Sequence, residues 1–470
     1  MTEIPLTITD AAAALRAGTL TSLELVEACF ARADALDETL GIYLHRLDGD
    51  ARATASQADE ELAAGTDRGP LHGIPLGIKD IIATNEAPTT AQSLVLDPAW
   101  GAQGDAPVVA RLRAAGAIIM GKTSTMEFAI GMPDASKPFP VPKNAWNPST
   151  WPGGSSSGSG SGVPAGFFLG ALGTDTGGSV RIPAAFCGIS GMKQTFGRVP
   201  KSGCVPLGYS LDHIGPMTRS ARDCAAMLGV MAGYDASDLT AADVAVPDYL
   251  AALSGRVEGL RIGVERANHL GATGVLPEAV EAFEAAVTWF AGAGATVEEV
   301  AIPNYQEIRN TGLVTMRGEA SSYHLSDLQS RWSDYGMYTN RFVGGGAFVT
   351  GADYVQAQRY RSHARAIMAE LMEPFDVLIM PTAGIGAPQV DGLDDTSFMG
   401  WPVFTPFWNP LGLPVLAIPM GFTNDGMPLS LQIAGKPFDE ATVFQVADAF
   451  QQATDHHLQV PSLVSGAVTA

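Results

Sequence analysis

Two serines that follow glycine pairs, and a lysine upstream of both, are the residues of this chain best suited to acyl-transfer chemistry. Ser155 follows the pair at 153–154, and Ser179 follows the pair at 177–178, 24 residues later. Lys79 precedes both. A serine hydroxyl becomes a good nucleophile when a neighbouring base takes its proton, and a buried, neutral lysine can be that base. The three residues therefore predict a serine hydrolase that needs no histidine.

The roles of the two serines follow from the same chemistry. One serine attacks the substrate, and the other can pass its proton to the lysine. The attack creates an oxyanion, which backbone N–H groups can stabilise. Thr176, Gly177 and Gly178 precede Ser179, and the two glycines leave their amides open to a substrate. We expect these three residues to form the oxyanion hole.

These segments resemble the amidase signature family, and the resemblance extends from about Thr7 to about Phe450. It implies that Ser179 is the nucleophile and Lys79 the base. It also implies that Ser155 is the proton shuttle, held by a cis peptide bond with Gly154. The activity implied is hydrolysis of linear amides.

Four neighbours are expected to support the catalytic residues: Thr174, Asp175, Ser156 and Arg181. Arg181 could instead bind a substrate carboxylate, as a nearby arginine does in malonamidase. We favour a structural role, in which Arg181 braces the loop that carries Ser179 (the serine loop) against Asp175.

The segment around Ser155 departs from the family pattern. All residues from 153 to 162 are glycine or serine, and Pro164 follows. Such a composition has low helix propensity and is typical of a flexible linker. We expect the segment to be closely packed, buried backbone with a shortened or irregular helix.

Helices alternate with short apolar strands along the chain, which predicts a mixed α/β sheet. The resemblance specifies a single large α/β/α sandwich with a long mixed β-sheet covered by helices on both faces. We expect one amidase domain over 1–470, with N-terminal helices in 8–65, a catalytic core in 69–220 and a C-terminal α/β portion in 259–455. Helices are predicted at 11–17, 22–36, 48–64, 107–115, 277–293 and 439–453, and strands at 117–120, 262–265, 296–302, 377–380, 414–418 and 429–433. Residues 70–79 are predicted to form a turn and then a short strand that ends at Lys79. The stretch 235–259 is predicted to be a surface excursion.

Composition narrows the functional classes. The net charge of −21 argues against direct contact with nucleic acid or an anionic membrane. No secretory signal or transmembrane segment is recognised, so a cytoplasmic monomer or homodimer is expected. The histidines and cysteines show no metal-ligand spacing, and no metal or cofactor is predicted.

Three motifs favour other functions but lack the right context. Residues 116–123 match the nucleotide-binding P-loop, but a helix is predicted before them and strand-forming residues lie inside. Residues 154–158 match a nucleophile elbow centred on Ser156, but neither the strand nor the helix it needs is predicted around it. Cys187 could be a nucleophile but is expected to be a buried thiol.

The substrate is less clearly indicated. The amidotransferase branch of the family carries an aspartate near the position of Pro402, where it receives the ammonium group of glutamine. The surroundings here are aromatic and apolar, and the loop 131–151 could add an apolar rim. We therefore expect a stand-alone hydrolase of apolar or aryl amides, with possible ester or carbamate (urethane) hydrolysis. The alternatives are the glutamine-hydrolysing subunit of a tRNA-dependent amidotransferase and a catalytically inactive member. The predicted substrate contacts are Ala129, Ile130, Gly131 and Met132.

Overall fold

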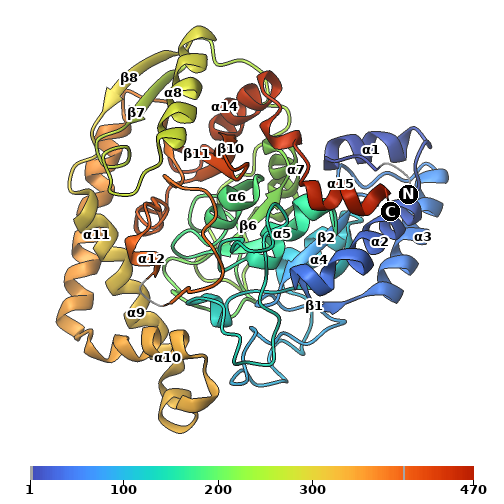
Figure 1. Cartoon of the computed structure of the whole chain (residues 1–470), viewed down its shortest axis with the longest axis horizontal. Coiled ribbons are helices and arrows are strands. Elements are labelled where there is room, and N and C mark those ends of the chain that lie inside the picture. The colour runs from blue at the N-terminus through green and yellow to red at the C-terminus, as the bar shows by residue number, and fades with distance from the viewer. Residues whose placement is uncertain (1–3, 395–396, 470) are drawn as a thin grey trace.

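One mixed sheet of eleven strands forms the centre of the computed structural model, which describes residues 4–394 and 397–469 (Figure 1). The strands are β1 Tyr43–Arg46, β2 Pro75–Lys79, β3 Ile118–Thr123, β4 Gly170–Asp175, β5 Ser190–Lys193, β6 His213–Thr218, β7 Arg261–Glu265, β8 Thr296–Val300, β9 Val377–Pro381, β10 Val415–Phe422 and β11 Pro428–Gly435. Their order is β1-β3-β2-β4-β6-β5-β10-β11-β9-β7-β8. β2 is parallel to β3 and β4, β7 is parallel to β8 and β9, and the remaining pairs are antiparallel. The predicted long mixed sheet is confirmed.

Helices cover both faces of this sheet. They are α1 Ile8–Arg16, α2 Ser22–Leu40, α3 Asp48–Ala63, α4 Pro107–Ala114, α5 Ser157–Ala165, α6 Arg181–Cys187, α7 Ala221–Met231, α8 Pro277–Gly292, α9 Tyr305–Ser330, α10 Met337–Gly344, α11 Gly351–Met372, α12 Ser397–Gly400, α13 Trp408–Leu411, α14 Glu440–Ala453 and α15 Ser462–Thr469. Successive side chains along β11 point to opposite faces of the sheet. Gln432 points to Arg181 of α6, whereas Leu431 and Ile433 join the main core with Phe444 of α14.

The glycine–serine run 153–162 is buried, as predicted, and its residues from Ser157 onward form the first part of α5. All nine residues of the helix are buried. Its serines hydrogen-bond to neighbouring backbone: Ser159 Oγ donates to Leu172 O at 2.8 Å, and Ser161 Oγ donates to Lys143 O at 2.8 Å. Its glycines allow close approach, since a Cβ on Gly158 would lie 2.6 Å from Ser124 N. Tertiary contacts thus hold a helix that its composition disfavours.

The sequence-based prediction missed the helices between β8 and β9. α9, α10 and α11 stand together at one side of the molecule, opposite the N-terminal helices (Figure 1). The sequence-based prediction also missed the strands β1, β4, β5 and β6 and the helices α6, α7, α12, α13 and α15. The other predicted helices and strands are confirmed, with small changes at their ends.

The stretch 235–259 contains neither helix nor strand, in agreement with the predicted surface excursion. In the described part of the chain, no helix is both long enough and apolar enough to cross a membrane.

Candidate active site

Lys79 lies at the end of β2, an interior strand of the sheet, and is fully buried. Its Nζ donates hydrogen bonds to Ser155 Oγ at 2.6 Å and to Thr174 Oγ1 at 2.7 Å. Burial lowers the pKa of Lys79 to about 7, although Cys204, Asp175 and other acidic groups act in the opposite direction. A substantial fraction of this lysine is therefore neutral near neutral pH.

Ser155 is fixed by its backbone immediately before α5. The Gly154–Ser155 peptide bond is cis. Ser155 O accepts hydrogen bonds from Met126 N at 3.1 Å and from Thr125 Oγ1 at 2.9 Å. These contacts leave the Ser155 hydroxyl directed at Lys79.

Ser179 lies on the loop between β4 and α6 and is partly exposed. Its backbone O accepts from Ser156 N at 3.3 Å, which joins the two serine segments. Among the described residues its hydroxyl has no hydrogen-bond partner, so the predicted Ser155–Ser179 hydrogen bond is absent from this structure. Such contacts often tighten only when substrate binds.

The oxyanion hole of Thr176, Gly177 and Gly178 stays a prediction, and one contact of the structure bears on Gly178. Its N–H donates to Asp175 Oδ1 at 2.8 Å and is therefore already used by the loop itself. The backbone N–H groups of Gly177 and Ser179 have no acceptor among the described residues. Thr176, the third predicted member, is held by its side chain, which donates to Asp212 Oδ1 at 2.5 Å.

A buried ion pair holds the serine loop. Arg181 Nε donates to Asp175 Oδ2 at 3.0 Å, and both side chains are fully buried. The other guanidinium nitrogens donate to Thr405 O, Gln432 Oε1 and Asn409 Oδ1 at 2.8–3.0 Å. Burial alone would favour the neutral acid, but Arg181 holds the pKa of Asp175 well below its usual range. The structural interpretation of Arg181 is therefore the one that the geometry supports.

Thr174 and Ser156 also occupy supporting positions. Ser156 Oγ accepts from Thr174 N at 3.1 Å and donates to Thr174 O at 3.2 Å, so this hydroxyl links the Ser155 segment to β4. The Thr174 side chain contacts Lys79 directly.

The four predicted substrate contacts do not form one surface. Ala129 lines a cavity of about 260 Å³ beside Lys79, together with Thr174 and Thr176. Ile130 and Met132 are buried, and Met132 packs in a core cluster with Trp151. Gly131 is exposed. Trp151 is thus core rather than part of an entrance rim.

The competing motifs are structural in this chain. Lys122 of the P-loop match is buried in β3, where its Nζ lies 3.1 Å from Asp80 Oδ1 and donates to Thr89 Oγ1 at 2.8 Å. Cys187 is buried, and burial raises the pKa of its thiol, which donates to Pro152 O at 3.3 Å.

Sequence reasoning missed several residues that shape the serine loop. Thr405 Oγ1 donates to Gly177 O at 2.9 Å, and Asn409 Nδ2 donates to Asp175 Oδ1 at 2.8 Å. Both lie in the segment 401–414, whose sequence draws attention only to its apolar character. Asp212 and Met316 give no signal in the sequence, because each reaches the loop from a distant segment.

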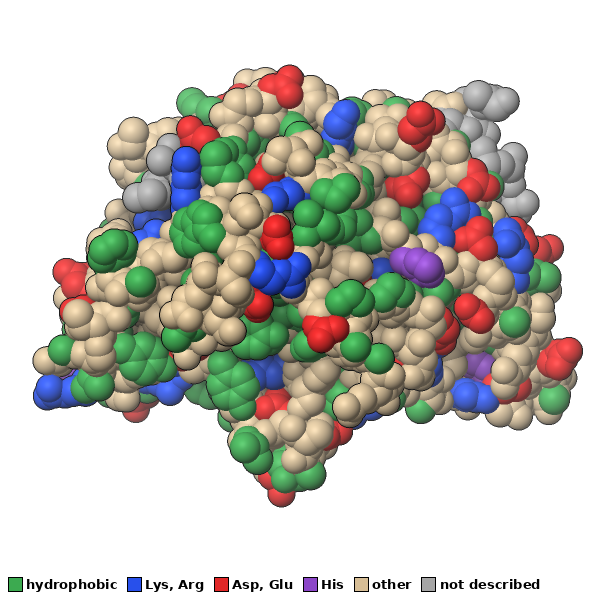
Figure 2. Space-filling model, turned by 90° about the horizontal axis from the view of Figure 1, so that it is seen from below, with side chains coloured by type: hydrophobic (Ala, Val, Ile, Leu, Met, Phe, Trp, Pro, Cys, Tyr) green, Lys and Arg blue, Asp and Glu red, His purple; other side chains and the backbone are tan. Residues whose placement is uncertain are grey.

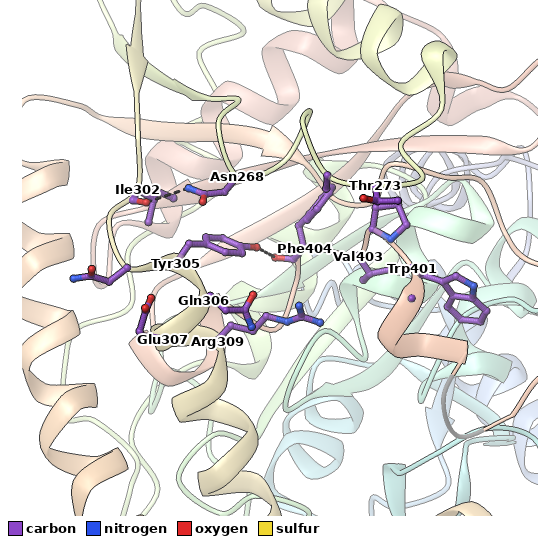
Figure 3. Close-up of a pocket in the computed structure, with 14 residues that line it drawn as sticks. Asn268, Thr273, Ile302, Tyr305, Gln306, Glu307, Arg309, Trp401, Val403 and Phe404 are labelled. Atoms are coloured by element: carbon purple, nitrogen blue, oxygen red, sulfur yellow. Dashed lines mark hydrogen bonds between the residues drawn. The ribbon is translucent and has the colours of Figure 1, made fainter.

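A second, larger cavity of about 620 Å³ lies between the start of α9 and residues 400–404 (Figure 3). Tyr305, Arg309, Trp401, Val403 and Phe404 are among its lining residues. Phe404 directly precedes Thr405, so one wall of this cavity continues into the contacts that hold the serine loop.

A mixed α/β sheet carries a buried lysine in contact with a serine, beside a glycine-rich loop that bears a second serine, and this arrangement is compatible with an amide-hydrolysing enzyme. A family model described as Amidase matches residues 24–444, and the chain belongs to this family of amide-hydrolysing enzymes.

Individual relatives span nearly the whole chain. A glutamyl-tRNA(Gln) amidotransferase subunit of Chloroflexus aurantiacus is 38% identical, covering 99% of this chain and 100% of the relative. A solved chain described as part of a vestigial protein complex bearing on the origins of an s-triazine catabolic enzyme is 30% identical, with a TM-score of 0.87 and coverage of 95% and 98%. Native peptide amidase from Stenotrophomonas maltophilia is 29% identical, with a TM-score of 0.83 and coverage of 96% and 98%.

Proposed function

We propose that this chain hydrolyses a carboxamide C–N bond through an acyl-enzyme on Ser179. The observation that carries the proposal is the fully buried Lys79, whose Nζ lies 2.6 Å from Ser155 Oγ. A lysine with a pKa of about 7 can accept a proton at neutral pH. In the proposed reaction, Ser155 donates this proton to Lys79.

The proposed reaction moves one proton along this path. Neutral Lys79 takes the Ser155 proton as Ser155 takes the proton of Ser179, and Ser179 Oγ attacks the amide carbon. The N–H groups of Gly177 and Ser179 receive the oxyanion. The proton then returns through Ser155 to the leaving nitrogen, and water cleaves the acyl-enzyme by the same path in reverse.

We infer that the substrate is glutamine rather than an apolar or aryl amide. A relative that is a glutamyl-tRNA(Gln) amidotransferase subunit, 38% identical over nearly the whole chain, supports this alternative over the apolar reading. The chain would then supply ammonia within a complex whose partner binds tRNA. A nucleophile that works through an acyl-enzyme suits this role, because the amide nitrogen is released before water enters.

A second candidate is a stand-alone hydrolase of other amides. Pro402 favours it, because the glutamine-specific branch places an aspartate there for the substrate ammonium group. Trp401 adds an aromatic side chain nearby, with its ring centroid 5.8 Å from that of Trp151 and the two rings tilted by 40°.

Purified chain and chain co-purified with its cellular partners would be assayed for ammonia release from glutamine and from an acyl p-nitroanilide. We expect glutamine to be the better substrate by kcat/KM, and Ser179→Ala to abolish the release. A higher kcat/KM for the p-nitroanilide, in both preparations, would favour the second candidate.

A further inference from the structure

Arg309 is the positively charged residue that lines the larger cavity, of about 620 Å³. Its guanidinium extends from α9 across the cavity toward Val403 and Trp401, whereas Glu307 lies at the end away from Trp401 (Figure 3). Within the described chain, Arg309 has no hydrogen-bond or ion-pair partner, and no other lysine or arginine lines this cavity. Most arginines of this chain are paired, such as Arg181 and Arg266.

The helix places Arg309 on the same side as the serine loop. Met316 lies seven residues further along α9, which is about two helical turns or roughly 10 Å. The Cε of Met316 would lie 3.2 Å from a Cβ added at Gly177, so this face of α9 contacts the serine loop. Arg309 therefore lies at the remote end of the face that borders the reacting centre.

The wall of the cavity opposite α9 also adjoins the serine loop. It is formed by residues 400–404, whose last member precedes Thr405, the residue that bonds Gly177 O. Two other polar side chains of the cavity are already engaged: Asn268 Nδ2 donates to Glu265 Oε1 at 2.7 Å, and Gln306 Nε2 donates to Asn310 Oδ1 at 2.9 Å. Thr273 and Glu307 also line the cavity, and Arg309 is the positively charged group among its lining residues.

We propose that this cavity receives a carboxylate of the amide substrate, with Arg309 as its partner. A guanidinium matches a carboxylate through two parallel hydrogen bonds. A chain with a net charge of −21 repels anions in general, so an anionic substrate needs a local cation of this kind. The inference rests on the proposed amidase function and specifies the substrate class as amides with a carboxylate several bonds from the scissile group.

The test compares two amides that differ in charge. Glutaramate carries a terminal carboxylate, and glutaramide replaces it with a neutral carboxamide. Arg309→Ala should lower kcat/KM for glutaramate by about tenfold or more, mainly through KM, and change it less than about twofold for glutaramide. Arg309→Lys should recover part of the loss, since the charge remains but the paired hydrogen bonds do not.

Arg359→Ala is the matched control. Arg359 is an exposed arginine on α11 outside the cavity, and its loss changes the net charge equally. Both kcat/KM values should stay within about twofold of wild type, because exposed charges contribute little. Equal losses on both substrates in Arg309→Ala, or no loss on either, would overturn the proposal.

A binding measurement separates this inference from the proposed reaction. Glutarate would be titrated calorimetrically into Ser179→Ala and into Ser179→Ala combined with Arg309→Ala. We expect the second protein to bind about tenfold more weakly, whether or not wild type turns over any amide tested. Equal binding, or binding to neither, would overturn the cavity assignment, whereas absence of turnover alone would count against the proposed function.

Discussion

Lys79 is one of three fully buried lysines, and its partners distinguish it from the other two. Lys122 pairs with the Asp80 carboxylate, and Lys193 donates to the Leu413 carbonyl. Lys79 alone among the three contacts a serine hydroxyl. A neighbouring carboxylate stabilises the charged ammonium form of a lysine. The Ser155 and Thr174 hydroxyls, in contrast, can also hydrogen-bond to Lys79 when its amine is neutral. The geometry thus supports Lys79 as the base.

The roles of the serines can be separated by substitution. Ser179→Ala should lower amide kcat by at least about 10⁴-fold and abolish labelling by a fluorophosphonate probe. Ser156→Ala should retain substantial activity, because its hydroxyl contacts only the Thr174 backbone. Probe labelling with site identification by mass spectrometry checks both. Label on Ser156 or Cys187 would contradict the assignment of the nucleophile.

The pH dependence of kcat/KM should show an acid limb near pH 7. Lys79 must be neutral to act, and burial lowers its pKa to about 7, so activity rises as pH increases through that value. His213 cannot give this limb, because burial holds its pKa well below its usual range.

Lys79→Ala provides the measurement. Amide hydrolysis should fall by about 10³-fold, and the acid limb should disappear. A matched ester should lose less, because an alkoxide or phenoxide departs with less protonation than an amine. An unchanged acid limb would refute the base role, and equal losses on amide and ester would refute protonation of the leaving group.

At the scale of elements, α5 shows why composition misleads. Its glycines suggest flexibility, but they permit close packing. A Cβ on Gly160 would lie 2.7 Å from Pro183 Cβ, and α6 carries that proline immediately after the serine loop. Nothing local in the sequence reveals which segments pack against these positions.

Gly158→Ala should therefore destabilise the protein although alanine favours helix. The added Cβ would lie 2.6–2.7 Å from the backbone of Ser124 and Ile42, and overpacking of this kind costs about 1–3 kcal/mol in the free energy of unfolding. Gly49→Ala in α3 is the control, since a Cβ there meets nothing within 4 Å. It should gain about 0.5–1 kcal/mol. Urea unfolding of both variants gives the comparison, and a stabilised Gly158→Ala would contradict the packing argument.

β2 and its terminal lysine were predictable from sequence, whereas β4 and the α9 side of the site were not. β2 and its terminal lysine stand out as an apolar run bounded by glycine and proline. α9 gives no such pattern, because most of its buried residues are small or polar, including Thr311, Gly312, Thr315 and Ser321. Hydrophobic periodicity finds a helix only when its buried face is apolar. Arg309 and Met316 were missed for this reason.

At the scale of the whole molecule, the sheet brings together segments far apart in sequence. The serine loop leaves β4, and its brace includes Gln432 of β11, four strands away in the sheet order. Arg181 and Asp175 are both buried at this junction. Removing one member of such a pair leaves an unpaired buried charge. The buried contacts that join distant strands of the sheet therefore also hold the serine loop in place.

The molecule's charge sets the last prediction, which concerns tRNA. Acidic and basic side chains are interspersed on the face shown in Figure 2, with no continuous basic patch there. With 28 basic against 49 acidic residues, the chain carries a net charge of −21 and should repel a polyanion. We expect no binding of tRNA to the isolated chain in a gel-shift assay up to about 10 µM at low salt, where such contacts are strongest. If the chain serves an amidotransferase, nucleic-acid contact must come from a partner, and the reconstituted complex should shift tRNA. Retention of tRNA by the isolated chain would contradict the argument from charge.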